Sequence, residues 1–596
     1  MINIVPPAFI YFIGACILPF LPGRRMKQAL ALLIPVIAFI DLLHMPHGVY
    51  WTYPFLGYEL VLGRVDKLSM VFGYVFVIIS FLSILYAIHI REYGQHVAAY
   101  LYVGSSLGVV FSGDLFTLFI CWEIMAAASV FLIWYGRTKA SLDAGFRYIL
   151  VHLVGGCILM AGIVMQVVQT GSIGFSMFDF GTTAAKFILV GFIINAAVPP
   201  LHAWLPDAYP EGTITGSVFM TAFTTKSAVY VLARSFAGVE ILVWLGAVMT
   251  IYGVVYAVLE KDLRRLLAYH IVSQVGYMVC GVGLGSQMAI NGASAHAFCH
   301  ILYKALLFMG AGAVIHVTGK RKMTDLQGCN LYRKMPLTLA LYMVGAFSIS
   351  AVPLFNGFVS KTMVVAAAGK LDRPAIELML HLASIGTFLS VGLKLPWGTW
   401  FGKPDGIANE ISPAKEPPIN MLLAMGLTAF LCIFTGVYPK PIYDLLPYAV
   451  DFHPYEAGHV VAALQLLLLT AAAFWIFIDK LMAGKPAVSL DTDWFYRMLG
   501  RALFRFCNFP LQRFSNSIRS FTTGGTARLA DFSRNPAAVL ELLWNKLQGK
   551  AMSDKYPAGR IHPANNRPFP IGWGVCASIL FLFFYGLVYL RLFTFF

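Results

Sequence analysis

The sequence predicts an all-α, polytopic membrane protein with about sixteen transmembrane helices and a C-terminal lateral amphipathic helix. The chain has 596 residues, of which 59% are hydrophobic and 12% are charged, and its mean hydropathy is +0.74. Soluble domains carry about 25% charged residues, so most of this chain is expected to lie in a membrane. The apolar runs are long and lack the alternation of a membrane β-barrel, which leaves helices as the spanning elements.

The expected spans are apolar runs of about 20 residues, the length that crosses a bilayer. In chain order they cover residues 3–21, 27–44, 67–89, 97–113, 115–135, 144–169, 185–204, 213–235, 241–259, 264–284, 291–316, 338–369, 376–400, 420–438, 459–480 and 571–591. Residues 45–66 are too polar and aromatic to span, and they are expected to form a short extracytoplasmic or interfacial hairpin. The N-terminal run lacks a basic region, so it is interpreted as a first span rather than a cleaved signal.

Two expected spans carry internal breaks. One reads FIINAAVPPLHAWLPDAYPEG and holds four prolines, and the other reads SISAVPLFNGFVSKTMVV and holds Pro353 and Gly357. Proline disrupts a helix, and irregular backbone within a membrane persists only where protein or a water-filled cavity satisfies it. Interrupted helices in corresponding halves are typical of transporters with inverted repeats. The spacing of the breaks predicts halves at residues 97–235 and 241–400.

Ionisable side chains within the expected spans are the candidate functional residues, because each costs about 2.5–3.5 kcal/mol to insert. Glu123 and Lys226 lie deep in their spans, and Lys361 follows the second break. A buried lysine loses its proton readily, which suits a proton carrier. Lys394 lies nearer a span end, where it either snorkels or joins the path. The charged segment EKDLRRLLAYH is interpreted as a cytoplasmic loop.

A stripe of three titratable residues marks the segment SAHAFCHILYKALLF. His296, His300 and Lys304 are spaced by four residues, which places them on one face of a helix. Histidine titrates near neutral pH, and groups one turn apart can pass a proton with water between them. Two alternatives remain open: the histidines ligate a haem or metal ion, or they are hydrogen-bonded core residues. The adjacent lysine argues against a metal because it repels a cation.

The C-terminal part is basic and amphipathic. Residues 497–569 contain twelve Lys or Arg residues, against three acidic ones. Arg497, Arg501 and Arg505 recur every four residues, which predicts a helix lying in the membrane interface, against lipid headgroups or along neighbouring subunits. Interruptions are expected at Gly524, Gly525 and Pro536. In a membrane protein the formal charge of +15 indicates cytoplasmic loops and headgroup contact rather than nucleic acid.

No cofactor site is expected in this chain. The nine cysteines are scattered without CxxC pairs, which argues against iron–sulfur and zinc sites and against a disulfide framework. Neither a GxGxxG turn nor a GxxxxGK[ST] loop is present, so no nucleotide fold is indicated. The line of Glu123, Lys226, His300, Lys304 and Lys361 describes a proton or cation pathway whose energy comes from a partner.

Several motifs resemble the antiporter-like subunit family, which includes the D subunit of Mrp-type Na⁺/H⁺ antiporters and the membrane subunits of respiratory complex I and membrane-bound hydrogenases. They are DLFTLFICWEIM, PLHAWLPDAYPEG, KDLRRLLAYHIVSQVGYM, AHAFCHILYKALLFMGAGAVIH, NGFVSK and DTDWFYR. The resemblance covers about residues 60–440. It implies fourteen core helices with two inverted five-helix repeats, each holding a broken helix, and in some branches a lateral helix followed by a last span.

The resemblance also implies a proton path and one departure from it. The family's path is matched by Glu123, Lys226, His296, His300, Lys304 and Lys361. The lysine that the family carries in its first broken helix is replaced by Asn195, which cannot titrate. Either Lys186 substitutes for it, or the first half-channel works differently or not at all.

The expected organisation combines these observations. It comprises N-terminal helices and hairpin in 1–96, a first antiporter-like repeat in 97–235, a second in 241–400, C-terminal core helices in 401–485, a basic lateral helix in 490–569 and a final anchor in 570–596. The expected function is movement of H⁺, either alone or in exchange for Na⁺. The protein is expected to act within a multisubunit complex of a bacterial or archaeal cytoplasmic membrane. The complex is either a redox-driven translocase or a cation/proton antiporter. The rival hypotheses are a non-conducting scaffold of the same fold and a stand-alone secondary transporter.

Overall fold

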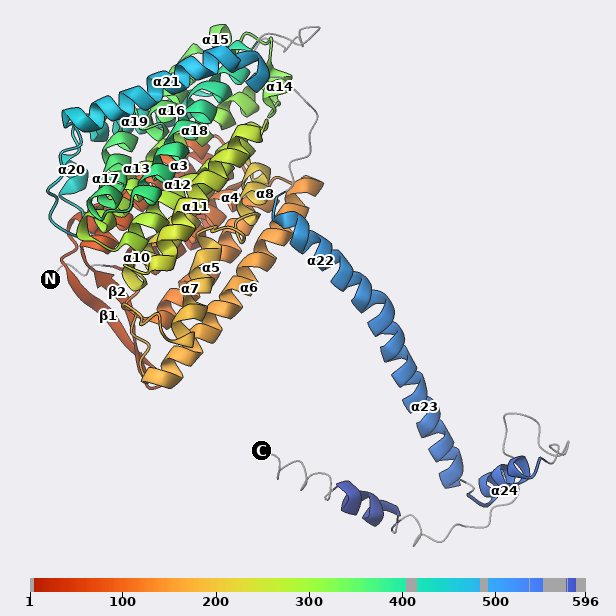
Figure 1. The fold of residues 1–596 in the computed structure, drawn as a ribbon. Coiled ribbons are helices and arrows are strands. Elements are labelled where there is room, and N and C mark those ends of the chain that lie inside the picture. Colours follow the sequence, from red (N-terminus) through yellow and green to blue (C-terminus); the bar gives the residue numbers. More distant parts are fainter. Residues whose placement is uncertain are drawn as a thin grey trace. The chain divides into compact units, whose positions relative to one another are not determined.

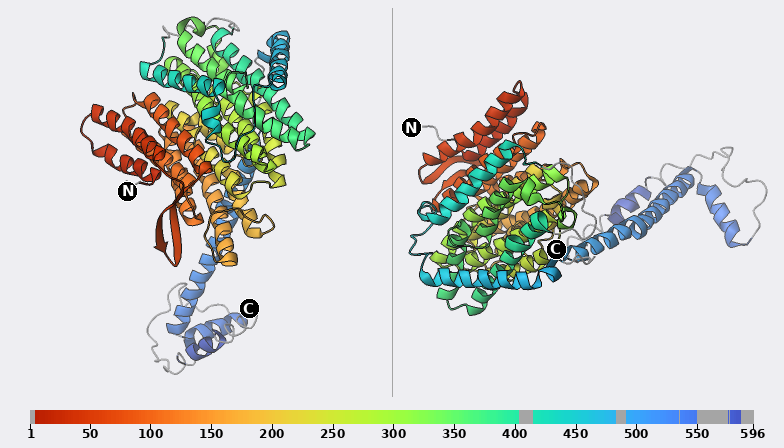
Figure 2. Two further views of the ribbon diagram at one scale, coloured as in Figure 1. Left: turned by 90° about the vertical axis from the view of Figure 1, so that its left-hand side faces the viewer. Right: turned by 90° about the horizontal axis from the view of Figure 1, so that it is seen from above.

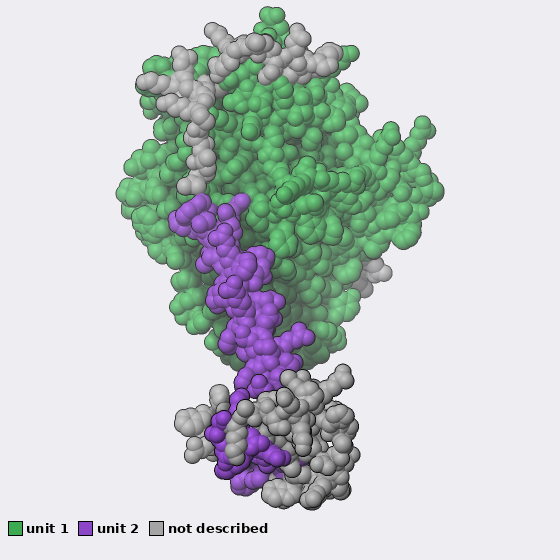
Figure 3. Space-filling model, turned by 90° about the vertical axis from the view of Figure 1, so that its right-hand side faces the viewer, with its two compact units in different colours: residues 1–493 green, residues 494–596 purple. Residues whose placement is uncertain are grey.

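The computed structural model describes residues 5–402, 415–482, 491–534, 536–549, 575 and 577–585. The chain divides into two compact units, Met1–Asp493 and Trp494–Phe596, which are coloured separately in Figure 3. Ten of the described helices are long and apolar enough to cross a membrane, and Pro7–Phe20, Thr183–Asn195 and Pro336–Ile349 are shorter apolar helices. The protein is therefore a mainly helical, multi-pass membrane protein, as the sequence predicts.

The first unit begins with two helices and a β-hairpin. Its elements up to the first break are α1 Pro7–Ile17, η1 Leu18–Phe20, α2 Arg24–Leu43, β1 Gly48–Phe55, β2 Tyr58–Val65, α3 Lys67–Ala87, α4 Tyr93–Phe111, α5 Leu115–Trp134, α6 Lys139–Thr170 and α7 Thr183–Asn195. The strands β1 and β2 pair antiparallel, with Gly48 opposite Val65 and Phe55 opposite Tyr58. The hairpin predicted within residues 45–66 is thus present.

The remaining elements of the first unit include its core helices. They are α8 Trp204–Ala208, η2 Tyr209–Glu211, α9 Ile214–Met220, α10 Thr224–Ser235, α11 Glu240–Leu259, α12 Leu263–Leu284, α13 Gln287–Thr318, α14 Met323–Leu326, α15 Leu331–Lys334, α16 Pro336–Ile349, α17 Asn356–Lys370, α18 Pro374–Thr387, η3 Phe388–Lys394, η4 Trp397–Phe401, α19 Ile419–Val437, α20 Lys440–Tyr443 and α21 Ala457–Met482. The buried helices α12 and α13 lie at the core, with α11, α16, α17 and α18 around them (Figure 1, Figure 2).

Both predicted breaks are present, and a third occurs that the sequence does not signal. Helix α7 ends at Asn195 and α8 begins at Trp204, while α16 ends at Ile349 and α17 begins at Asn356. The third break separates α9 from α10 between Met220 and Thr224. The expected span at 213–235 is therefore two short helices.

Gly357 permits the close approach that shapes the second break. A Cβ atom at this position would overlap the backbone oxygen of Ser348, at the end of α16. Neither backbone can yield without moving a helix end. We expect Gly357→Ala to reduce the yield of folded protein and to lower its thermal midpoint in detergent. Gly426→Ala in α19 is the matched control, since nothing lies within 4 Å of a Cβ there, and it should leave both quantities unchanged.

Two parts of the first unit share local features at a constant spacing of 148 residues. Asp114 caps α5 and bridges to Gly174, and Asp262 caps α12 and bridges to Lys322. Helices α6 and α13 each have 32 residues. Each of them ends on a left-handed glycine, Gly171 or Gly319, whose φ angle is 69°.

The described part of the second unit is helical and largely exposed. It contains α22 Asp493–Phe506 (which begins one residue inside the first unit), η5 Cys507–Leu511, α23 Gln512–Arg534 and α24 Pro536–Leu547. Residues 493–534 are helical without interruption, so the break expected at Gly524 and Gly525 is wrong, although Pro536 does begin a new helix. At 1.5 Å per residue this helix is about 60 Å long. Of the expected span at 571–591, residues 575 and 577–585 are helical and the rest lies outside the described residues.

Candidate proton pathway

The stripe on α13 lies in an enclosed part of the first unit. His296, His300 and Lys304 are all 0% exposed, which makes them fully buried within the protein rather than lipid-facing. Helix α13 is enclosed by neighbours that include α3, α9, α10, α12, α16, α17 and α19. Placing ionisable side chains within a membrane protein costs free energy. Their enclosure here therefore points to function rather than to headgroup contact.

The two histidines differ in their hydrogen bonding. His296 pairs through Nδ1 with Ser360 Oγ at 3.1 Å and through Nε2 with the Tyr303 hydroxyl at 3.4 Å. Tyr303 also donates to Gln274 Oε1 at 3.4 Å, so polar contacts run from α13 to α12. Among the described residues, neither ring nitrogen of His300 has a hydrogen-bond partner. His300 is therefore the stripe's histidine whose ring N–H and ring lone pair are both unused by the described residues, so a water molecule can bind either and the lone pair can accept a proton.

Lys226 on α10 and Lys304 on α13 are close enough to repel each other electrostatically. The Lys304 ammonium is buried, has no hydrogen-bond partner among the described residues and lies within Coulombic range of Lys226. The Lys226 ammonium donates to the carbonyl oxygen of Thr221 at 2.6 Å and to Thr225 Oγ1 at 3.1 Å. Thr221 lies in the third break, so this lysine occupies a carbonyl that an intact helix would use internally. His300 interacts electrostatically with both lysines.

Lys361 lies at the second break and lines a cavity. Its ammonium donates to the carbonyl oxygen of Ile349, the last residue of α16, at 2.8 Å. A cation is favoured there because the free carbonyls at a helix C-terminus carry partial negative charge. The ammonium also lies 5.0 Å from the centroid of the Tyr277 ring on α12. The side chain therefore links α17 to the end of α16 and to α12.

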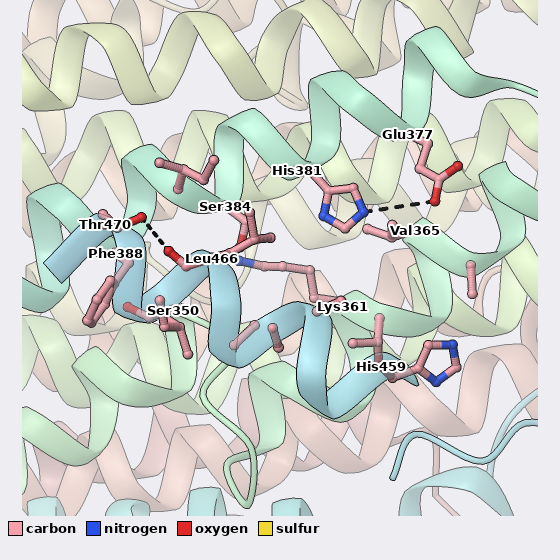
Figure 4. A pocket seen from close by; sticks show the side chains of 17 residues that line it. Ser350, Lys361, Val365, Glu377, His381, Ser384, Phe388, His459, Leu466 and Thr470 are labelled. Carbon is pink, nitrogen blue, oxygen red and sulfur yellow. Dashed lines mark hydrogen bonds and ion pairs between the residues drawn. The ribbon is translucent and has the colours of Figure 1, made fainter. Parts of the chain in front are cut away.

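The cavity beside Lys361 has a volume of about 190 Å³ and is shown in Figure 4. It is lined by α17, α18, α21 and the end of α16, and the Lys361 side chain points across it toward Ser384. His381 and Glu377 of α18 line it as well, with His381 Nε2 3.9 Å from Glu377 Oε1, and both side chains are more than a third exposed. Polar groups thus extend from the buried lysine toward the protein surface.

The first half of the predicted pathway is arranged differently. The Glu123 carboxylate packs against α6, where a Cβ atom at Gly156 would overlap Oε1. Asn195 is fully buried at the end of α7, and within the described chain neither of its side-chain polar atoms has a partner. Lys186 is exposed near the start of the same helix, nine residues earlier. The asparagine, rather than Lys186, occupies the buried position.

Two further residues have structural surroundings that their sequence context does not reveal. The Lys394 ammonium donates to the carbonyl oxygens of Val258 and Glu260 at 2.6 and 2.8 Å, and it thereby caps the C-terminus of α11. His270 is fully buried in α12 and pairs through Nε2 with Ser390 Oγ at 2.7 Å. The interpretation of EKDLRRLLAYH as a loop is therefore wrong for its last residues, which are helical.

Sequence reasoning missed a buried carboxylate that holds the end of the first unit. Asp491 accepts hydrogen bonds from the Tyr252 and Tyr269 hydroxyls at 2.5 and 2.6 Å, and its carboxylate lies 3.3 Å from His202 Nε2. Burial alone raises the pKa of Asp491, but the interactions with His202 and the two tyrosines lower it below its usual value. The carboxylate is therefore ionised at neutral pH. It ties residues preceding α22 to α11, α12 and the segment of the first break that contains His202.

Removing this carboxylate should destabilise the first unit. Asp491→Ala leaves the buried Tyr269 hydroxyl, the half-buried Tyr252 hydroxyl and His202 without their acceptor, a loss of about 3 kcal/mol for a broken buried pair. We expect a clearly lower thermal midpoint of the purified protein. Asp444→Ala is the control because its pair with Lys440 is exposed and is worth under about 1 kcal/mol. Equal midpoints for the two variants would show that Asp491 does not hold this segment.

Comparison with known proteins identifies a family. Residues 112–390 match the model of the family described as NADH:quinone oxidoreductase/Mrp antiporter, transmembrane. The matched region contains α5 to α18 and, apart from Lys394 and Asp491, all of the buried residues described above.

Individual relatives agree with this match. The chain is 32% identical over 387 residues to NADH-quinone oxidoreductase subunit N of Desulforudis audaxviator (strain MP104C). This alignment covers 58% of this chain and 75% of that protein. It is 30% identical over 493 residues to the A subunit of the Na⁺/H⁺ antiporter of Alkalihalophilus pseudofirmus, covering 72% of this chain but 60% of that protein. It also spans only 43% of the A/B subunit of a probable K⁺/H⁺ antiporter of Rhizobium meliloti.

The fold has a counterpart among solved structures. A chain of the Mrp complex from Dietzia sp. DQ12-45-1b superposes with a TM-score of 0.66 at 22% identity, covering 78% of this chain and 98% of that one. The two chains thus share the same overall fold. On the sequence matches, the chain belongs to the NADH:quinone oxidoreductase/Mrp antiporter family of membrane proteins.

Proposed function

We propose that this protein moves protons across the membrane as one subunit of a multisubunit complex. The single observation that carries the proposal is the group of buried, electrostatically coupled residues Lys226, His300 and Lys304, with Lys361 beside a cavity. A group of this kind exchanges protons because gaining or losing charge at one member changes the cost of charge at the next. No energy-supplying site is expected in this sequence, so the driving reaction belongs to partner subunits.

In this proposal the route has an entrance, a middle and an outlet. The proton enters at Glu123, in the first of the two repeats. It is then carried through the core of the first unit by Lys226, His300 and Lys304. Lys361 then releases it into the cavity that His381 and Glu377 line. The helix breaks next to Lys226 and Lys361 support the proposal, because each lysine can leave its backbone carbonyl when the segment rearranges.

We further propose that α4 to α10 and α11 to α18 are two inverted copies of one five-helix unit. The constant spacing of 148 residues between Asp114 and Asp262 and between Gly171 and Gly319 supports this interpretation. We also propose that the basic helix of residues 493–534 lies along neighbouring subunits or headgroups in a bacterial or archaeal cytoplasmic membrane. Its exposed arginines and aromatic residues support an interfacial position.

Proton uptake into vesicles containing the intact complex tests the function. A conducting subunit predicts that replacing a lysine of the core slows uptake, whereas a non-conducting scaffold predicts unchanged uptake with every such variant. Purification in mild detergent tests the second rival, because a lone monomer with transport activity would identify a stand-alone transporter. Repeating uptake with Na⁺ replaced by choline distinguishes H⁺ movement alone from exchange against Na⁺.

A further inference from the structure

His152 is a buried titratable residue that the pathway described so far does not use. It lies on α6, is 1% exposed and stacks on Tyr148 with ring centroids 4.1 Å apart. The Trp204 ring stands edge-on at 4.6 Å on another side. A histidine enclosed in this way is a costly residue to keep within a membrane unless its titration is used.

The hydrogen bonding of His152 fixes its tautomer. Nδ1 lies 2.9 Å from the carbonyl oxygen of Tyr148, and because a carbonyl only accepts, Nδ1 carries the hydrogen. The neutral ring therefore keeps a lone pair on Nε2. This nitrogen is buried and has no hydrogen-bond partner in the part of the chain that the structure describes. His152 is thus prepared to accept a proton on Nε2 without giving up its existing bond.

The spacing of 148 residues gives His152 a counterpart on the stripe of α13. Under that spacing Tyr148 corresponds to His296, His152 to His300, and Gly156 to Lys304. The helices α6 and α13 have equal length and the same left-handed C-terminal glycine, so these positions are equivalent along the two helices. In the first half, therefore, the histidine is kept, while a glycine stands where the second half carries a lysine.

Gly156 brings Glu123 close to His152. The carboxylate occupies the space that a side chain at Gly156 would fill. His152 lies one helical turn from Gly156 on the same face of α6, about 6 Å away along the axis. Trp204, which packs against His152, also donates through Nε1 to the carbonyl of Ile194, the neighbour of Asn195. The imidazole is therefore linked through Trp204 to the end of α7.

A chain of hydroxyl groups continues from this point toward Lys226. The Tyr148 hydroxyl pairs with Ser129 Oγ at 2.8 Å and also interacts with Thr224. Thr224 Oγ1 pairs with the Tyr102 hydroxyl at 2.6 Å. The next residue, Thr225, accepts the hydrogen bond from the Lys226 ammonium. Hydroxyl groups both donate and accept, so the linked hydroxyls of Ser129, Tyr148, Thr224 and Tyr102 can relay a proton as far as Thr224, one residue before the partner of Lys226.

We propose that His152 is the proton-carrying residue of the first half, standing between Glu123 and Lys226 where Asn195 supplies no titratable side chain. The proposal rests on the proposed function. Nε2 accepts the proton arriving from Glu123 to give the imidazolium, and it later releases that proton toward Lys226, while the bond from Nδ1–H to Tyr148 is kept throughout. The first half is therefore conducting, through a histidine instead of a lysine.

Proton uptake by vesicles containing the intact complex tests this assignment with four versions of the chain: wild type, His152→Gln, Asn195→Lys and the double variant. Glutamine keeps a polar side chain of similar reach but cannot carry a proton. We expect His152→Gln to slow uptake at least about tenfold, the scale on which a lost proton carrier acts. Asn195→Lys alone should conduct, and the double variant should recover at least half of the wild-type rate, because a lysine then supplies the missing group.

The outcomes separate this proposal from the proposed function. Wild-type uptake in His152→Gln, with uptake lost in a variant of Lys304, would overturn the role of His152 and leave the function standing. Unchanged uptake in both would overturn the function itself. Loss that Asn195→Lys does not rescue would assign His152 a structural role instead. If His152→Gln does not assemble, His152→Lys carries the test: retained uptake supports proton carriage, and loss of uptake in an assembled complex contradicts it.

Discussion

Replacing Lys304 by alanine is expected to stop most proton movement by the complex. The ammonium is fully buried in α13, has no hydrogen-bond partner among the described residues, and interacts with Lys226 and His300. Its removal interrupts the proposed pathway between Lys226 on α10 and His300 on α13. We expect uptake by reconstituted vesicles to fall at least about tenfold, as for loss of a proton-transferring side chain.

The fold should tolerate this change, which makes the result interpretable. Because the ammonium has no bonding partner among the described residues, removing it relieves a desolvated charge instead of orphaning another buried group. The thermal midpoint of Lys304→Ala should accordingly stay close to that of the wild type, because the relieved charge offsets the cavity that the shorter side chain leaves. His316→Ala, at the exposed end of the same helix, is the control and should leave uptake unchanged. Normal uptake by Lys304→Ala would remove this residue from the pathway.

Replacing Lys361 by arginine is expected to separate its structural role from its transport role. The ammonium satisfies the carbonyl of Ile349 at the end of α16, and a guanidinium can donate the same hydrogen bond. Arginine does not give up its proton in proteins, so it cannot release one into the cavity. We therefore expect Lys361→Arg to assemble with a thermal midpoint near that of the wild type, while proton uptake falls at least about tenfold.

The alanine variant completes this comparison. Lys361→Ala removes the donor as well as the titratable group, so it should lower both the thermal midpoint and the uptake. Lys370→Ala changes an exposed lysine at the end of the same helix and should alter neither. If Lys361→Arg transported protons at the wild-type rate, the release of a proton by this residue would be excluded, and its role would be limited to holding the break.

The helices and two of the breaks were predictable because their signals are local. Apolar runs, prolines and the hairpin between spans are read directly from the sequence, and they lie where the structure has α7, α8, α16, α17, β1 and β2. The stripe on α13 was equally visible because helical periodicity alone places His296, His300 and Lys304 on one face. That these side chains take part in a proton path remains a prediction.

The features that were not predictable depend on contacts between distant segments. The break between α9 and α10 contains neither proline nor glycine, and it coincides with the Lys226 ammonium binding the carbonyl of Thr221. Asp491 contacts His202 and accepts hydrogen bonds from two tyrosines of other helices, and Lys394 donates hydrogen bonds at the end of α11. In the basic helix, Gly524 and Gly525 are weak helix formers, yet a cost of about 1 kcal/mol each does not end a helix of this length.

The number of protons moved per turnover of the intact complex tests the central claim most directly. The measurement compares wild type with a chain in which Lys226, Lys304 and Lys361 are all arginine, keeping every charge while preventing proton release. A proton-conducting subunit predicts a lower ratio of protons to turnovers, with the complex still assembled. An unchanged ratio would contradict the account and would make this chain a scaffold of the same fold.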